Sequence, residues 1–111
     1  MLNEICVMGR MVKDVELRYT QNEKAVANFT LACERDRAVN GERQTDFIDC
    51  VAWDKGAEFV SKYFHKGSMA VVKGRLQSRK WEDRDGNKRI NFEVMTESIY
   101  FGESARDGDR H

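Results

Sequence analysis

The sequence predicts an all-β domain, a small barrel of five strands with one short helix between the third and fourth strands. Five segments alternate apolar and polar residues with a period of two, as strands with one buried face do. Between the third and fourth segments, apolar residues recur at helical spacing instead. The 111 residues contain no proline and no internal repeat, and this length fits one domain.

The first two strands are predicted over residues 2–12 and 25–35, with a short extended segment between them. A glycine inside the first strand predicts a bulge or sharp bend at Gly9, which small barrels use at their corners. The second strand leads into a charged hairpin loop over 35–44, in which Asn40-Gly41 is the turn signal.

The third strand, residues 45–53, has two unlike faces. One face is small and apolar around Cys50, and the other carries a ring near each end, Phe47 and Trp53. If the small residues face the core, both rings point outward, where they can stack on nucleobases of any sequence. The opposite arrangement, with Phe47 and Trp53 as ordinary core residues, is equally compatible with this strand alone.

The helix is expected to begin at Asp54, which can cap it, and to end at Gly67. It would plug one end of the barrel, and its aromatic residues are expected to be core. These residues are Phe59, Tyr63 and Phe64.

The fourth and fifth strands are predicted over residues 68–81 and 89–101, joined by a long hairpin tip built on Asp85-Gly86. The alternation of the fourth strand assigns Ala70, Val72, Gly74 and Leu76 to its core face. On the fifth strand, Ile90, Phe92 and Val94 share one side.

The other face of the fourth strand is basic and ends in a ring, with Arg75, Arg79 and Trp81 in one row. Lys55 comes shortly after Trp53, and Lys80 precedes Trp81. Cations beside rings suit single-stranded nucleic acid, because phosphates need cations and unpaired bases need flat apolar partners. A solvated strand face is the open alternative for the cations. Trp81 lies in a charged setting where a buried tryptophan would be unusual.

The charge balance excludes a generic basic coat, because 19 Lys and Arg residues match 19 Asp and Glu residues. Any positive footprint for nucleic acid must therefore be local. No apolar run approaches the length of a membrane span, and no signal-peptide pattern opens the chain, so we expect no membrane partner.

The three cysteines, Cys6, Cys33 and Cys50, are odd in number and widely spaced, which argues against a disulfide framework or a zinc site. They are expected to be reduced core thiols, which favours the cytoplasm. The histidines, His65 and His111, have no partner at metal spacing, so we expect no metal, no cofactor and no enzyme. A hydrolase using a cysteine and His65 is the enzymatic alternative.

The element order matches the OB-fold, a five-stranded Greek-key barrel. Several motifs also occur together, in this order: Met8-Gly9-Arg10, Lys13-Asp14, Glu16-Leu17-Arg18-Tyr19-Thr20, Ala25-Val26-Ala27-Asn28-Phe29-Thr30-Leu31-Ala32, Lys66-Gly67-Ser68, Gly74-Arg75-Leu76-Gln77-Ser78-Arg79-Lys80-Trp81 and Asp85-Gly86. On these motifs, residues 1–101 closely resemble the bacterial-type single-stranded DNA-binding proteins.

The resemblance implies an OB-fold domain over residues 1–101 that forms a homotetramer. The homotetramer would wrap single-stranded DNA without strong sequence preference in replication, recombination and repair. Family members stack bases at positions matching Phe47, Trp53 and Trp81, and they contact phosphates in the segments that hold Lys55, Arg75, Arg79 and Lys80. Arg37 stands where the family usually has another stacking aromatic. Its guanidinium can still stack on a base and pair with a phosphate.

The family's long C-terminal tail, with an acidic and hydrophobic tip that recruits replication and repair enzymes, has no counterpart in this sequence. Residues 102–111 are polar and are expected to be a short disordered tail, so tail-mediated partners are not expected. A cytoplasmic, nucleoid-associated protein fits, or one in the host cytoplasm if it is phage-encoded. The alternative function is an OB-fold assembly module that uses the same surface for protein contacts, as in a primosome-type accessory factor.

Overall fold

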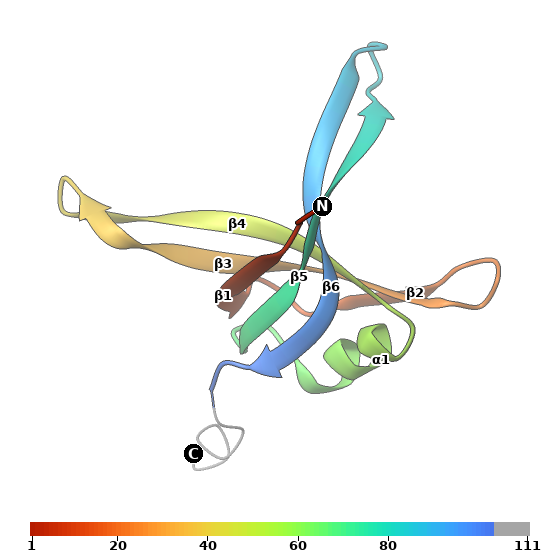
Figure 1. The fold of residues 1–111 in the computed structure, drawn as a ribbon, viewed down its shortest axis with the longest axis horizontal. Helices are drawn as coiled ribbons and strands as arrows, with labels where there is room; N and C mark the ends of the chain where they lie inside the picture. The colour runs from red at the N-terminus through yellow and green to blue at the C-terminus, as the bar shows by residue number, and fades with distance from the viewer. Residues whose placement is uncertain (104–111) are drawn as a thin grey trace.

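The computed structural model describes residues 1–103, except for the side chain of Val39. Its elements are β1 (Ile5–Met11), β2 (Glu16–Tyr19), β3 (Ala25–Val39), β4 (Glu42–Trp53), α1 (Asp54–Tyr63), β5 (Met69–Glu82) and β6 (Lys88–Phe101), as Figure 1 shows. The tail expected at 102–111 lies outside the described residues from position 104 onward.

Five strands close into a barrel, and α1 lies at one end of it (Figure 1). Around the ring, β1 pairs with β5, β5 with β6, β6 with β4, and β4 with β3. The ring closes where β3 returns to β1 at Arg10 and Met11. Only the pairing of β4 with β6 is parallel, and the short β2 adds to the outer edge of β3. This arrangement confirms the predicted OB-fold.

The core lies inside the ring and is completed by α1. Val60 and Phe64 come from the helix region and are fully buried against small residues of β3, β4 and β5. The inward face predicted for the second strand is confirmed, since Ala27, Phe29 and Leu31 are almost completely buried, and Met11 on β1 and Cys50 on β4 are buried with them. Burying each large apolar side chain contributes roughly 1.5–3 kcal/mol, so this cluster is the main source of stability.

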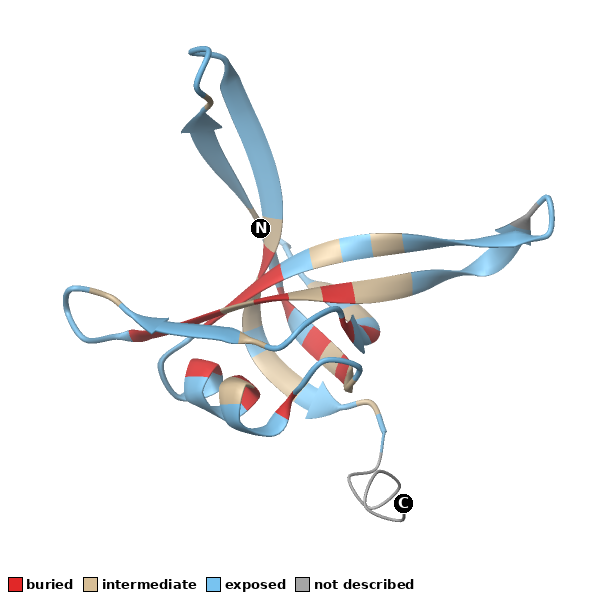
Figure 2. Cartoon of the chain, turned by 180° about the vertical axis from the view of Figure 1, so that it is seen from behind, coloured by how far each residue is buried: buried red, intermediate tan, exposed pale blue. Residues whose placement is uncertain are grey.

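Two hairpins extend well beyond the barrel (Figures 1 and 2). The β3–β4 arm (residues 34–46) is a strand hairpin where a charged loop was predicted, with a register shift between Glu34 and Ala38. It turns at Asn40 and Gly41 with φ values of 53° and 80°. The β5–β6 arm (residues 76–92) is pale blue along its length in Figure 2, because no core covers it. The prediction of Leu76 as a core residue is therefore wrong, and Ile90 and Phe92 are likewise exposed on this arm.

Three smaller predictions are also wrong. Cys6 is exposed and Cys33 is only half-buried, so Cys50 is the one core thiol of the three. Asp54 does not cap α1. Its φ of 55° places it in the left-handed region, and Trp53 is the N-cap residue, without a side-chain cap bond. Phe59 and Tyr63 are partly exposed.

Gly9 is needed for close packing rather than for a bulge. β1 keeps an unbroken register with β5 from Ile5 to Arg10, so no bulge is present. A Cβ atom at Gly9 would lie 2.6 Å from the Ala32 carbonyl oxygen and 2.8 Å from Cys33 Sγ. The missing side chain therefore lets β1 approach β3 where the barrel closes.

No helix among the described residues is long and apolar enough to cross a membrane.

Gly9→Ala is expected to lower the free energy of unfolding by about 1–3 kcal/mol, because the added methyl group meets backbone that cannot easily move. Gly56→Ala is the matched control. Its Cβ would lie 4.0 Å from the Ala52 Cβ, and replacing a helical glycine should stabilise by up to about 1 kcal/mol. Urea denaturation of both variants measures the difference, and equal stability of Gly9→Ala and the parent would contradict the packing argument.

Candidate nucleic-acid interface

The pairing of β4 with β6 fixes which side chains face outward. Cys50 pairs with Val94, and both residues are buried in the core. Their neighbours Val51 and Met95 form the next pair, and Met95 also pairs with Arg75 on β5. Because side chains alternate along a strand, Val51, Met95 and Arg75 point to the opposite side, away from the core.

Five of the predicted site residues share this outward side. On β4, Phe47 and Trp53 lie at even spacing from Val51, and on β5 the same holds for Arg79 and Trp81 relative to Arg75. The three rings are exposed by 66% (Phe47), 40% (Trp53) and 44% (Trp81). The open question about the third strand is thus settled, because its rings point outward. We call this surface the outer face, and it comprises Phe47, Trp53, Arg75, Arg79 and Trp81.

The other three predicted residues lie around the outer face rather than in it. Lys55 lies in the first turn of α1, beside the end of β4. Lys80 pairs with Ile90 and so points to the opposite side of the β5–β6 arm from Trp81. Arg37 lies in the β3–β4 arm, where the register shifts between Glu34 and Ala38.

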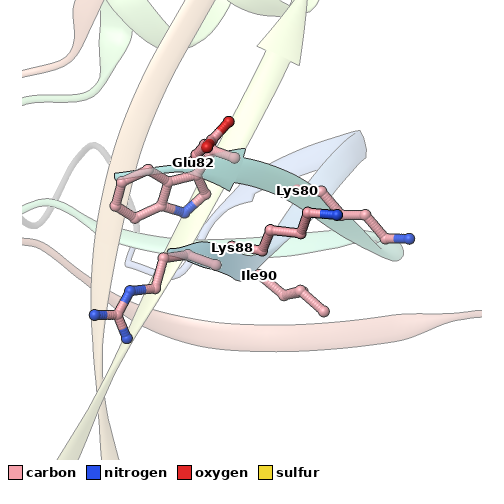
Figure 3. Close-up of a pocket in the computed structure, with 6 residues that line it drawn as sticks. Lys80, Glu82, Lys88 and Ile90 are labelled. Carbon is pink, nitrogen blue, oxygen red and sulfur yellow. The ribbon is translucent and has the colours of Figure 1, made fainter. Parts of the chain in front are cut away.

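Trp81 is held in a defined orientation near the tip of the β5–β6 arm. With the Asn91 amide oriented to place its oxygen toward the indole, Asn91 accepts a hydrogen bond from Trp81 Nε1 at 3.2 Å. A hollow of about 490 Å³ is lined by Trp81 and its neighbours on both strands. Figure 3 shows that Lys80, Lys88 and Ile90 project from this part of the arm. An oriented, half-exposed ring among cations can accept a base without losing much side-chain entropy.

The predicted phosphate-binding cations are not neutralised by any described residue. Among residues 1–103, none of Arg37, Lys55, Arg75, Arg79 and Lys80 forms an ion pair. The pairs that do form are Arg10–Glu103, Lys13–Glu16, Arg35–Asp46, Arg43–Glu34, Lys73–Glu4 and Arg89–Asp83. The predicted site cations can therefore pair with phosphates without first breaking an internal contact.

Arg35 illustrates the opposite case, two positions before Arg37. Its guanidinium donates two hydrogen bonds to Asp46, at 2.9 and 3.0 Å, and a third to Gln44. The hydrogen bond to Arg35 lowers the pKa of Asp46 below its usual value. This fork joins β3 to β4 across the arm, so Arg35 stiffens the arm while Arg37 is left available.

The centre of the outer face is polar and mixed in charge, because Lys13 and Arg79 line the same hollow as Glu16, Asp49 and Glu93. A hollow of about 120 Å³ brings Arg79 of the β5–β6 arm close to Asp49 on β4 and Glu93 on β6. Thr30 Oγ1 donates a hydrogen bond to Asp49 Oδ1 at 2.9 Å. Carboxylates repel phosphates but accept hydrogen bonds from base amino groups. A strand crossing here would place its bases inward and its phosphates toward the surrounding cations.

The enzymatic alternative is not supported by the chemistry of Cys50. Burial, with a smaller contribution from the charges of Cys33, Asp49 and Glu93, raises the pKa of its thiol to about 12. A thiol nucleophile reacts as the thiolate, which this environment suppresses. Among the described residues, no group of three or more His, Cys, Asp and Glu side chains could hold a metal ion.

Comparison with known proteins agrees with this geometry. The Single-strand binding protein family matches residues 2–102. The chain belongs to this family. It is 50% identical to the single-stranded DNA-binding protein of Halalkalibacterium halodurans over 102 residues, covering 91% of this chain and 61% of the relative.

Two further relatives are similar over most of this chain. The single-stranded DNA-binding protein of Bacillus cereus is 50% identical over 97% of this chain and 64% of its own length. Single-stranded DNA-binding protein A of Bacillus subtilis is 48% identical over 97% of this chain and 63% of its own length. The chain therefore spans less than two thirds of these family members.

Sequence reasoning missed several exposed apolar side chains of this family member. Phe59 and Tyr63 on α1 were expected to be core residues but are exposed, and so are Ile90 and Phe92 on the β5–β6 arm, whose exposure was not predicted. The signal for the arm was its length. Each strand of this hairpin has 14 residues, twice the 7 of β1, so part of it had to leave the barrel.

The three thiols should differ strongly in reactivity. At pH 8, a pKa of about 12 leaves Cys50 with roughly a thousandfold less thiolate than a thiol at the ordinary 9.0, while Cys6 is exposed. Iodoacetamide should therefore label Cys6 first and Cys50 only after unfolding, as mass spectrometry of timed digests can measure. Labelling of native Cys50 as fast as Cys6 would contradict the burial argument.

Proposed function

We propose that this protein binds single-stranded DNA without strong sequence preference and without catalysis, in replication, recombination and repair. The observation that carries the proposal is the outer face, with three half-exposed rings and two cations that form no ion pair among the described residues. Membership of the single-strand binding protein family supports the same function. The assembly-module alternative has no observation in its favour.

Binding would combine stacking with phosphate neutralisation. Bases stack on Phe47, Trp53 and Trp81, and each stack contributes roughly 1–3 kcal/mol whatever the base. Arg75 and Arg79 pair with phosphates along the same face. In a duplex the bases are already stacked and paired, so the rings gain nothing, and this difference gives the preference for single strands.

The peripheral cations extend the path beyond the outer face. Lys80 meets the backbone where the strand passes around the β5–β6 arm, and Lys55 meets it beside Trp53. Arg37 lies on the β3–β4 arm, where its guanidinium either stacks on a base or pairs with a phosphate. Long, exposed arms suit this role because they widen the surface around which a strand can wrap.

We also propose that residues 1–101 are the DNA-binding domain of a cytoplasmic homotetramer. One edge of β1 supports self-association. β1 pairs with β5 over Ile5 to Arg10, but with β3 only at Arg10 and Met11. Most of the second edge of β1 is thus unpaired among the described residues, and an unpaired strand edge is a template for a second copy.

Intrinsic tryptophan fluorescence tests the function. Poly-thymidine should quench the emission, because both tryptophans lie in the outer face, whereas a matched duplex should leave it unchanged. Trp81→Ala should weaken binding by about 1–3 kcal/mol, and Trp81→Phe should retain most of the affinity because it keeps a ring. Unchanged affinity in both Trp53→Ala and Trp81→Ala would refute stacking on these rings.

Salt dependence tests the phosphate contacts separately. For single strands, log affinity should fall with log salt by about 0.7 for each phosphate neutralised. Arg75→Ala and Arg79→Ala should each reduce the steepness of that slope by about 0.7, the value for one phosphate contact. Lys24→Ala, in the turn between β2 and β3, is the control and should leave the slope unchanged. Equal slopes for all three variants would rule out these two arginines as phosphate contacts.

A further inference from the structure

Helix α1 exposes rings that the barrel does not bury. Phe59 is exposed by 37% and Tyr63 by 47%, whereas Phe64 is buried. The Phe59 ring centroid lies 5.0 Å from that of Tyr63 and 6.1 Å from those of Phe64 and Phe101. Phe64 and Phe101 stack at 4.7 Å. Phe59 and Tyr63 are therefore the outer edge of an aromatic cluster that is anchored in the core.

Two lysines lie on the same side of α1 as these rings. At 3.6 residues per turn, positions 55, 59, 62 and 63 fall within about 100° around the helix axis. Lys62 Nζ lies 5.3 Å from the centroid of the Tyr63 ring, so a cation and a ring are side by side. We call Lys55, Phe59, Lys62 and Tyr63 the α1 stripe.

Helix stability does not account for this pattern. Lys55 lies in the first turn, where the positive end of the helix dipole disfavours a cation by a few tenths to about 1 kcal/mol. Neither Lys55 nor Lys62 forms an ion pair within residues 1–103. Two cations without ion pairs there, alternating with two part-exposed rings, have the same chemistry as the outer face.

The α1 stripe continues directly from the outer face. Trp53 is both the last residue of β4 and the N-cap of α1, and Asp54 turns the chain between them with its left-handed φ of 55°. A strand stacked on Trp53 is therefore next to Lys55. The 10 residues of α1 extend for about 15 Å, which is room for two or more nucleotides.

We infer that the α1 stripe is a second stretch of the single-stranded DNA path. Phosphates of the strand leaving Trp53 pair with Lys55 and Lys62, and its bases stack on Phe59 and Tyr63. This inference rests on the proposed function, and it adds a binding site outside the strands of the barrel. Charge complementarity favours nucleic acid over a second copy of this chain, since the two lysines of the stripe form no ion pair among the described residues, not even with Glu58, the carboxylate one turn from both.

The test compares a long and a short strand. The short strand is the shortest poly-thymidine that gives full tryptophan quenching, so it fills the outer face alone. The double variant F59L/Y63L removes both rings but keeps apolar side chains, and Lys62→Ala removes one cation. Tyr100→Leu is the control, because it also removes an exposed ring. Tyr100 is next to Phe101 on β6, so its side chain points to the opposite side of the strand from the aromatic cluster.

For the long strand, F59L/Y63L should lose affinity by at least about fivefold, and Lys62→Ala should reduce the salt slope by about 0.7. Neither variant should change binding of the short strand, and Tyr100→Leu should match the parent with both. Thermal melting checks folding. If F59L/Y63L does not fold, Lys62→Ala tests the inference alone, because it alters one exposed side chain. Its slope of log affinity against log salt for the long strand then shows whether Lys62 contacts a phosphate.

Three results would overturn the inference. If the parent binds both strands and all variants match it, the α1 stripe is no part of the path, and the proposed function stands. If F59L/Y63L changes the mass measured by light scattering, the stripe is a contact between copies. If the parent binds neither strand, the proposed function fails, and the inference fails with it.

Discussion

The parallel pairing of β4 with β6 is the constraint on which the outer face depends. It is short, with Cys50 opposite Val94 and Val51 opposite Met95, but it closes the barrel and fixes the register of both strands. Because side chains alternate, burying Cys50 and Val94 forces Phe47 and Trp53 outward. A slip of one residue would bury the rings and expose the small residues. The same contact thus supplies core stability and presents the stacking surface.

The arms show what happens when alternation continues past the end of a core. Within the barrel, the inward face of β5 and β6 is buried, but along the β5–β6 arm that face has nothing to pack against. Leu76, Ile90 and Phe92 are therefore exposed although they continue the core pattern. The opposite face of the arm holds Arg79, which lines the hollow with Asp49 and Glu93, and Trp81, which lines the hollow near the tip. One hairpin carries both a binding row and an apolar face.

The period-two pattern predicted most of the fold, because one buried face leaves a clear alternation in each strand. It assigned the inward face of β3 and the position of α1 correctly, and it left the inward face of β4 open. It could not locate the end of the barrel, since Phe92 has the same alternation whether or not a partner layer covers it. It also could not separate a bulge at Gly9 from a close approach of two strands, which depends on the distance to Ala32 in another part of the chain.

For the binding site, sequence reasoning placed five residues on one face and left three around it. Lys80 was grouped with Trp81 because they are adjacent, but adjacent strand residues point to opposite sides.

The most direct test of the outer face is photo-crosslinking of bromodeoxyuridine-substituted poly-thymidine, with the crosslinked residues mapped by mass spectrometry. The account predicts crosslinks at Phe47, Trp53 and Trp81. Crosslinks confined to Ile90 and Phe92 would contradict it, because they would place the bases on the opposite face of the arm.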